Sequence, residues 1–156
     1  MTAAAPDKEG QADGPVPGCE GCSKVATALA GGDPWLIATL PKSVLLLGDH
    51  QIYEGYAVLW SRIHAKELHD LNDDDYAGLM ADLKRASRAV ERAAACLKLN
   101  VVSLGNVVQH AHLHLFPRSA DDPDRLRHPW VHEDRFKEAG SDALRTGWVR
   151  AIRERL

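Results

Sequence analysis

Three histidines alternate with apolar residues in the middle of the chain, and this pattern strongly constrains the local structure. The segment 110–116 reads His-Ala-His-Leu-His-Leu-Phe. Side chains two residues apart on a β-strand point to the same face, so His110, His112 and His114 are predicted to form one row. The apolar residues between them then point the other way, toward a core. A row of imidazoles is costly to bury without partners, so it indicates either a metal site or a site that handles phosphate.

The composition is that of a globular protein, and it argues against several classes of function. The 156 residues are 45% hydrophobic and 26% charged, as expected for one domain with its own core. The net charge of -3 provides no basic field for nucleic acid, and no apolar run approaches the roughly 20 residues of a membrane span, so neither partner is expected. Three cysteines form no disulfide framework, and no stretch resembles a signal peptide, so a cytoplasmic location is expected.

The predicted organisation is a disordered tail over residues 1–18 followed by a single domain over residues 19–156. The tail contains mostly Ala, Gly, Pro and charged residues and can bury almost nothing. A long helix capped by Asn72 or Asp73 and a C-terminal helix over about 141–155 follow from apolar residues at three- and four-residue spacing. Apolar runs between turn residues predict antiparallel strands at Trp35–Leu40, Ser43–Gly48, Tyr56–Ser61, Asn100–Gly105 and His110–Phe116. The predicted fold class is therefore α+β, with a mainly antiparallel five-stranded sheet and helices packed on it.

The histidine strand is compatible with two kinds of chemistry when only its residues are considered. Two histidines on one face of a strand can chelate Zn²⁺. A neutral imidazole can instead attack phosphorus as a nucleophile near pH 7. The remaining interpretation is that the alternating histidine and apolar residues lie at the surface and have no function.

Cys19 and Cys22 form a second motif, Cys-Glu-Gly-Cys, which is weak by itself. It is compatible with half of a zinc site, a redox pair or two incidental thiols. A redox pair requires a thioredoxin-like strand and helix, and the preceding Gly- and Pro-rich segment does not provide them. A structural zinc site requires two further ligands from elsewhere in the chain.

The histidine strand and its neighbours resemble the histidine triad family. The segment 110–116 fits the family motif His-φ-His-φ-His-φ-φ, in which φ is apolar, and Pro117-Arg118 follows it as in many members. The segment 55–64 resembles the family strand that ends in Pro-Lys/Arg-x-His, although Trp60-Ser61 stands where proline is usual. The segment 104–108 is similar to a bacterial branch described as diadenosine polyphosphate hydrolases. The resemblance covers roughly residues 19–130.

This resemblance implies a hydrolase or transferase that acts at the α-phosphate of adenosine nucleotides such as diadenosine polyphosphates. His112 would be the nucleophile, forming a nucleotidyl-histidine that water cleaves to a nucleoside monophosphate, and His114 would donate hydrogen bonds to phosphate oxygens. Asn106 occupies the place of a phosphate-contacting Gln or Asn, and Asp49 is a candidate for the ribose hydroxyls. Arg118 is a candidate phosphate contact because of its charge, or a solvated arginine at the end of a strand.

The resemblance also implies a structural zinc ion and no organic cofactor. Some family members bind zinc through an N-terminal Cys-x-x-Cys, the histidine that ends the Pro-Lys-x-His strand, and the first histidine of the triad. The corresponding residues here are Cys19, Cys22, His64 and His110. His110 would then serve the metal, and His112 would remain free for catalysis. A homodimer formed by the long helix and its neighbouring strand is a further expectation from the family.

Two alternative functions remain open on the sequence. The first is a zinc hydrolase in which His110, His112 and His114 are the ligands and a metal-bound water attacks the substrate. The second is a nucleotide-binding protein without catalytic activity, because a fold does not establish a reaction. Trp35 and Trp60 are predicted to be core residues rather than base-stacking ones, because they lie in apolar strands.

Overall fold

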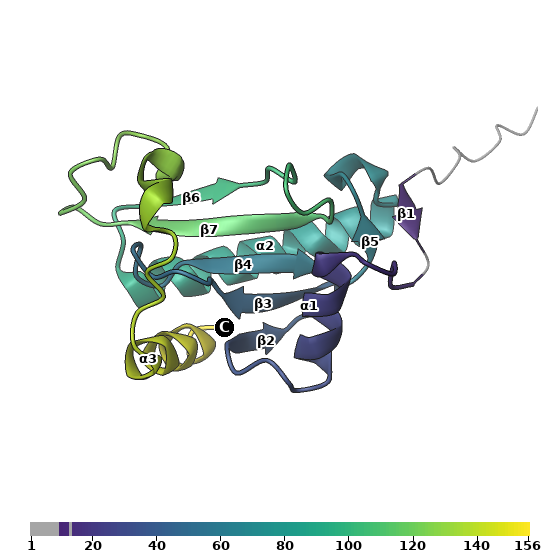
Figure 1. Ribbon diagram of the computed structural model, residues 1–156, viewed down its shortest axis with the longest axis horizontal. Helices are drawn as coiled ribbons and strands as arrows, with labels where there is room; N and C mark the ends of the chain where they lie inside the picture. Colours follow the sequence, from purple (N-terminus) through teal and green to yellow (C-terminus); the bar gives the residue numbers. More distant parts are fainter. Residues whose placement is uncertain (1–9, 13) are drawn as a thin grey trace, which may run out of the picture.

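The computed structural model describes residues 10–12 and 14–156. A five-stranded sheet with the order β2-β3-β4-β7-β6 forms the centre of this part of the chain (Figure 1). Every pair of neighbouring strands is antiparallel. The strands are β2 (Leu36–Thr39), β3 (Ser43–Leu47), β4 (Ala57–Ser61), β6 (Lys98–Val102) and β7 (His112–Arg118). The prediction of an α+β fold with a five-stranded antiparallel sheet is confirmed.

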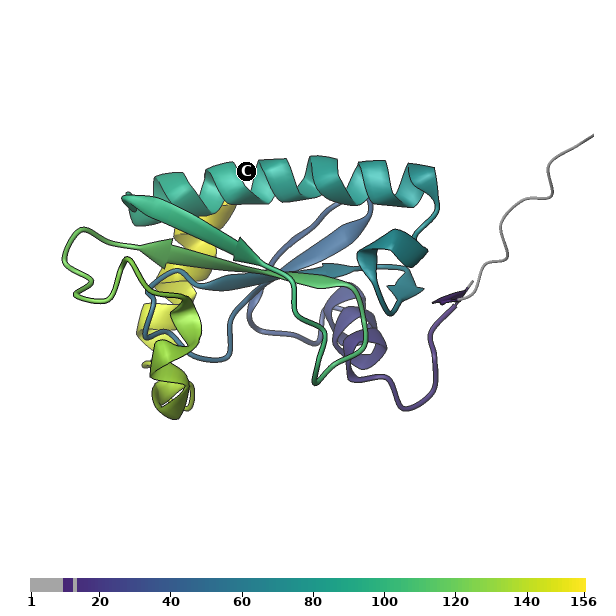
Figure 2. The ribbon, with the colours of Figure 1, turned by 90° about the horizontal axis from the view of Figure 1, so that it is seen from above.

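Both faces of the sheet are covered, so the central strands are apolar on both sides. The long helix α2 (Asp73–Ala94) lies along one face, and α1 (Glu20–Leu29) and the short helix η2 (Pro129–Arg135) lie on the other (Figure 2). Alternate side chains divide between these faces as the two-residue period of a strand requires. The core on the α2 side includes Leu45, Leu47, Leu59, Leu113 and Leu115. The core on the α1 side includes Val44, Leu46, Val58, Trp60 and Phe116.

The two long helices begin at side-chain caps, and the cap at Asn72 agrees with the prediction. Asn72 accepts a hydrogen bond from the backbone N–H of Asp75 at the start of α2, and Ser141 caps α3 (Asp142–Arg153) in the same way. The apolar pattern of helix α2 continues to Leu97, but the helix ends at Ala94, because Ala95 adopts a left-handed conformation with φ 47°. No helix within the described residues is long and apolar enough to cross a membrane.

Helix α1 is an element that the sequence pattern did not predict. Its buried side consists of small and medium residues, Cys22, Val25 and Ala28, which are too few for a convincing helical period. Gly21 lies in its first turn against the ring of His110. A Cβ at this glycine would lie 2.4 Å from that ring, so a glycine is needed for the close approach of α1 to the histidine segment.

Part of the segment that the sequence predicts to be disordered is ordered in the structure. Residues Gln11–Ala12 form the short strand β1, which pairs antiparallel with β5 (His64–Ala65). The Gln11 side chain accepts a hydrogen bond from the backbone N–H of Asn72 and donates one to Asp75, so it contacts the start of α2. A glutamine in a segment of low hydrophobicity gives no sign of such contacts. Residues 1–9 and 13 of the predicted tail lie outside the described residues.

The last two strands are shifted from their predicted positions. Strand β6 covers 98–102 rather than 100–105, and β7 covers 112–118 rather than 110–116. Pairing runs from Lys98 opposite Arg118 to Val102 opposite His114, and it stops before the loop that contains Gly105 with φ 72°. His110 therefore precedes the strand, and its side chain is free to take a direction different from those of the later two histidines.

Candidate active site and metal centre

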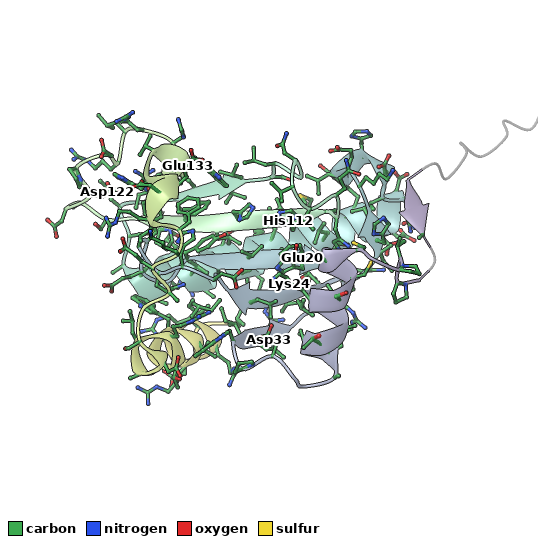
Figure 3. The ribbon with its side chains drawn as sticks, in the orientation of Figure 1. Glu20, Lys24, Asp33, His112, Asp122 and Glu133 are labelled. Atoms are coloured by element: carbon green, nitrogen blue, oxygen red, sulfur yellow. The ribbon has the colours of Figure 1, made fainter. Side chains whose placement is uncertain are left out.

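A cavity of about 460 Å³ lies on the face of the sheet between α1 and η2. His112 and His114 of β7 contribute to its floor, and Figure 3 shows Glu20 and Lys24 of α1 beside His112. The volume falls within the range of sites that bind small molecules and nucleotides. Other lining residues are the aromatic Trp35, Tyr56, Trp60, Trp130 and Phe136, and the polar Asp33, Asp49 and Asn106.

The first two histidines of the triad differ in which ring nitrogen carries the proton. His110 Nε2 lies 2.8 Å from the carbonyl oxygen of Ser61, and His112 Nδ1 lies 2.5 Å from the carbonyl oxygen of His110. A carbonyl oxygen only accepts hydrogen bonds, so each of these nitrogens must be a donor N–H. The lone pair is then on Nδ1 in His110 and on Nε2 in His112. The triad is therefore not one uniform row, because its first two members offer opposite nitrogens.

Burial keeps the imidazoles of the cavity neutral near pH 7. Burial lowers the pKa of His112, and the hydrogen bond to the His110 carbonyl and the Glu20 carboxylate oppose this effect. Burial lowers the pKa of His114 to about 4, with smaller contributions from His112 and His50. A neutral His112 retains the lone pair that a nucleophile requires.

Trp60 stacks on the ring of His112. The two ring centroids are 4.4 Å apart with an interplanar angle of 20°, because the residues lie directly opposite each other on β4 and β7. Trp60 is buried, as predicted for a core residue, and it also lines the cavity. An indole face attracts positive charge, so this stack would stabilise any cation that develops on the His112 ring.

Four side chains from separate parts of the chain converge beside the cavity to form a possible metal site. One ligand atom from each of Cys19, Cys22, His64 and His110 lies within 4.8 Å of the other three. The Cys22 Sγ atom is 3.4 Å from His64 Nδ1 and 3.6 Å from His110 Nδ1, and Cys19 Sγ is 3.5 Å from His110 Nδ1. Zn–S and Zn–N bonds at tetrahedral angles place sulfur and nitrogen about 3.5 Å apart. These residues therefore fit a zinc ion, and the Ser61 carbonyl orients His110 as an outer partner.

The other residues predicted for substrate contacts divide between the cavity and the interior. Asn106 and Asp49 both line the cavity, and the Asp49 carboxylate lies 3.6 Å from Lys24 Nζ. Arg118 does not line it, and its side chain is 0% exposed. Its guanidinium donates hydrogen bonds to Asp122, Asn100 and the backbone carbonyls of Asp124 and Arg127. Both predictions for Arg118 are wrong, because these groups hold it as a buried support of the segment after β7.

Comparison with known proteins identifies the fold and the family. The family model of the HIT domain matches residues 34–121, which include all five strands of the central sheet and the complete triad. The chain belongs to the HIT (histidine triad) family. Members of this family are generally nucleotide hydrolases or transferases. A search of curated proteins finds no match to this HIT protein.

Solved structures of other HIT proteins share its fold. A histidine triad protein from Bradyrhizobium japonicum is 30% identical with a TM-score of 0.68, and the alignment covers 77% of this chain and 88% of that one. A HIT protein from Sinorhizobium meliloti is 24% identical with a TM-score of 0.70, covering 78% and 88%. A zinc-bound histidine triad family protein from Mycobacterium smegmatis is 20% identical with a TM-score of 0.63, covering 88% and 91%.

Several residues of the site in this HIT protein were not identified from the sequence. Glu20 and Lys24 of α1 line the cavity. The only sequence signal for this helix is the four-residue spacing of their opposite charges around Cys22. Trp130 belongs to the segment His128-Pro129-Trp130, whose role the sequence left open. It lies on η2 and lines the cavity, with its ring centroid 5.4 Å from that of His114. Phe136, the residue directly after η2, also lines the cavity, and the sequence carries no recognisable motif at this position.

The buried His50 should make the stability of this HIT protein dependent on pH. Burial lowers the pKa of His50 to about 4, from 6.5 in the unfolded chain. Between these values the unfolded state binds the proton and the folded state does not, so acidification from pH 6.5 to 4 lowers the free energy of unfolding. The loss from this group is about 1 kcal/mol per pH unit. Urea unfolding at several pH values should show a smaller slope for His50→Phe than for wild type.

The matched control for this prediction is His69→Gln. The His69 side chain is 83% exposed, so its replacement should leave the slope of stability against pH unchanged. Both variants retain the cysteines and histidines of the metal group. The comparison therefore distinguishes the contribution of His50 to the slope from the contribution of that group. Equal slopes in wild type and His50→Phe would contradict the assignment to His50.

Proposed function

We propose that this HIT protein is a nucleotide hydrolase or transferase in which His112 attacks the α-phosphate of an adenosine nucleotide, such as a diadenosine polyphosphate. The observation that carries this proposal is the hydrogen bond from His112 Nδ1–H to the carbonyl oxygen of His110. It directs the lone pair to Nε2 on a buried ring that lines the cavity. The carbonyl also favours the positive charge that the ring acquires when Nε2 forms a bond.

The proposed reaction has two displacements at phosphorus. In the first, His112 Nε2 forms a bond to the α-phosphorus, and the bond from phosphorus to the leaving group breaks with its electron pair on that group. The nucleotidyl-imidazolium is stabilised by the His110 carbonyl and the face of Trp60. In the second, a water oxygen bonds to phosphorus, the phosphorus–nitrogen bond breaks, and the water proton passes to solvent. The product is a nucleoside monophosphate, and His112 returns to its neutral form.

The lining of the cavity supports roles for several other side chains. His114 would donate to an oxygen of the α-phosphate, and Asn106, which also lines the cavity, would contact a second phosphate oxygen. Asp49 would accept hydrogen bonds from the ribose hydroxyls, with Lys24 holding its carboxylate. Trp130 would pack on the nucleoside, because its ring closes the cavity beside His114.

We also propose that Cys19, Cys22, His64 and His110 hold one structural zinc ion. The sulfur-to-nitrogen distances and the zinc-bound relative from Mycobacterium smegmatis support this assignment. Zinc would join the start of α1 to the segments that hold His64 and His110. The alternative of a hydrolytic zinc held by all three triad histidines is not supported, because the group that fits a metal within the described residues includes neither His112 nor His114.

Product analysis and mass spectrometry would test the proposed function together. The protein would be incubated with diadenosine tri- and tetraphosphate, adenosine phosphoramidate and a nucleotide sugar, and the products separated by liquid chromatography. We expect a nucleoside monophosphate from at least one substrate and, after rapid quenching at neutral pH, a nucleotidyl adduct on the peptide that contains His112. The adduct accumulates only if it forms faster than water cleaves it. Under that condition, turnover without a detectable adduct would contradict the two-step mechanism. Binding without turnover would favour the nucleotide-binding alternative.

We further propose a homodimer that pairs through β6 and α2. Strand β6 is at the edge of the sheet, and Leu97 and Val101 beside or within it are 66% and 41% exposed. An exposed apolar edge strand is suited to pair with a second copy. Analytical ultracentrifugation should show a dimer for wild type and a monomer for Val101→Lys. The control Leu29→Lys changes an apolar residue of similar exposure, 45%, at the end of α1, which packs near β2 at the opposite edge of the sheet. This variant should remain dimeric, whereas a monomeric wild type would contradict the proposal.

A further inference from the structure

The hydroxyl of Tyr56 is hydrogen-bonded to His114, the third histidine of the triad. Tyr56 Oη lies 2.6 Å from His114 Nδ1, and both side chains line the cavity. Tyr56 is 5% exposed and immediately precedes β4, so the contact joins two segments 58 positions apart in the sequence. The proposed chemistry assigns no role to this tyrosine.

The position of the Tyr56 hydroxyl is determined by the packing of its ring. The ring stacks on His50, at 4.5 Å between centroids, and on Phe116, at 4.3 Å. Phe136 stacks on the far face of His50 at 4.1 Å. At the ring edge, a Cβ on Gly48 would lie 2.0 Å from Tyr56 Cδ1, so only glycine leaves room for the ring. The hydroxyl therefore has one accessible position, next to His114 Nδ1.

The direction of this hydrogen bond follows from the charge state of its two partners. Burial raises the pKa of Tyr56, with the Asp49 carboxylate adding to the effect, so the phenol keeps its proton. Burial lowers the pKa of His114 to about 4, so the imidazole is neutral and carries a single N–H. In this pair the hydroxyl can donate to Nδ1, and the proton of His114 is then on Nε2.

We propose that Tyr56 is a positioning residue that holds the His114 proton on Nε2, where the N–H is available to an oxygen of the substrate phosphate. The inference rests on the proposed function, because it assigns His114 its donor role. His112 and His114 would then have opposite tautomers. The His110 carbonyl places the lone pair of His112 on Nε2 for attack, and the Tyr56 hydroxyl places the proton of His114 on Nε2 for donation. Preorganised donors of this kind stabilise the negative charge that develops on phosphate oxygens.

The first test is NMR spectroscopy of the histidine rings, which does not require a substrate. Long-range proton–nitrogen spectra distinguish a protonated ring nitrogen from an unprotonated one. In wild type at pH 7.5 we expect His114 to carry its proton on Nε2 alone. In Tyr56→Phe we expect a mixture of the two tautomers, because Nδ1 has lost its donor. A wild-type His114 that carries its proton on Nδ1 would overturn the proposal, even if the variant failed to fold.

The second test is kinetic and uses a matched tyrosine as the control. Tyr56→Phe should lower kcat roughly 10- to 100-fold with little change in KM, which is less than the 100- to 1000-fold typical for complete removal of such a donor. Tyr53→Phe removes another buried tyrosine hydroxyl, which donates to the Pro129 carbonyl at 2.8 Å and does not contact His114. This control should leave both kcat and the tautomer of His114 unchanged.

The two tests also separate this inference from the proposed function. If wild type turns over no nucleotide, the proposed function fails, and the spectra still decide the tautomer of His114. If the protein is active and Tyr56→Phe retains both wild-type kcat and a single Nε2–H tautomer, Tyr56 has no positioning role. A parallel loss of kcat in Tyr53→Phe would also overturn the proposal, because the effect would then reflect packing of the aromatic cluster.

Discussion

His112→Asn is expected to abolish nucleotide turnover without disturbing the fold. Asparagine retains an N–H group near the His110 carbonyl but provides no nucleophilic nitrogen, so the covalent route is lost. Removal of a catalytic nucleophile typically costs about four to six powers of ten in kcat. Single-turnover measurements under saturating substrate, followed by chromatography of the nucleoside monophosphate, would give the rate constants of both proteins.

Binding measurements and a distant histidine provide the controls for this variant. Titration calorimetry with adenosine monophosphate should give dissociation constants within about threefold for wild type and His112→Asn, since a nucleophile contributes mainly to the transition state. His132→Asn replaces a histidine that lies 3.1 Å from Asp124 and does not line the cavity, so its kcat should be close to that of wild type. A His112→Asn protein that retains a tenth or more of wild-type turnover would rule out His112 as the nucleophile.

The elements with a regular apolar pattern could be predicted from the sequence, and those stabilised by a few specific contacts could not. The two-residue period around His112 and His114 placed both rings on one face, and the apolar spacing, with a cap at Asn72, marked the two long helices. Helix α1 has a narrow buried side, and its position depends on how closely Gly21 approaches His110. Such a contact between distant segments has no periodic signature.

The site shows the same division between local and distant information. The resemblance to the triad motif predicted His112 as a candidate catalytic residue, and the structure places its ring in the lining of the cavity. The Tyr56–His114 pair remained hidden because a tyrosine at the start of an apolar strand resembles an ordinary core residue. Arg118 was misinterpreted because arginine is rarely fully buried, and the sequence gives no sign that Asn100 and Asp122 meet its guanidinium.

The metal group leads to the second large expected effect, on stability. We expect the purified protein to contain one zinc ion per chain and Cys22→Ala to contain almost none. Loss of a structural metal is among the changes that cost more than about 4 kcal/mol in the free energy of unfolding. For a domain of this size that corresponds to a fall in Tm of about 10 °C. Elemental analysis by mass spectrometry and thermal unfolding followed by circular dichroism would measure the two effects.

Cys96→Ala is the matched control, because Cys96 is a free cysteine outside the metal group. This variant should keep its zinc and a Tm within a few degrees of wild type. Cys22→Ala with wild-type Tm, or wild type purified from zinc-supplemented cells without the metal, would contradict the structural role.

Cys22→Ala should also lower turnover, although Cys22 does not line the cavity. The ring of His110 belongs to the metal group, while its carbonyl oxygen accepts the hydrogen bond that sets the tautomer of His112. Release of the His110 ring would let this carbonyl move, and the lone pair of His112 would no longer be confined to Nε2. We therefore expect kcat of the folded Cys22→Ala protein, measured well below its Tm, to fall at least 10-fold with a smaller change in KM. An unchanged kcat in folded, zinc-free protein would show that the metal group stabilises the fold without orienting the nucleophile.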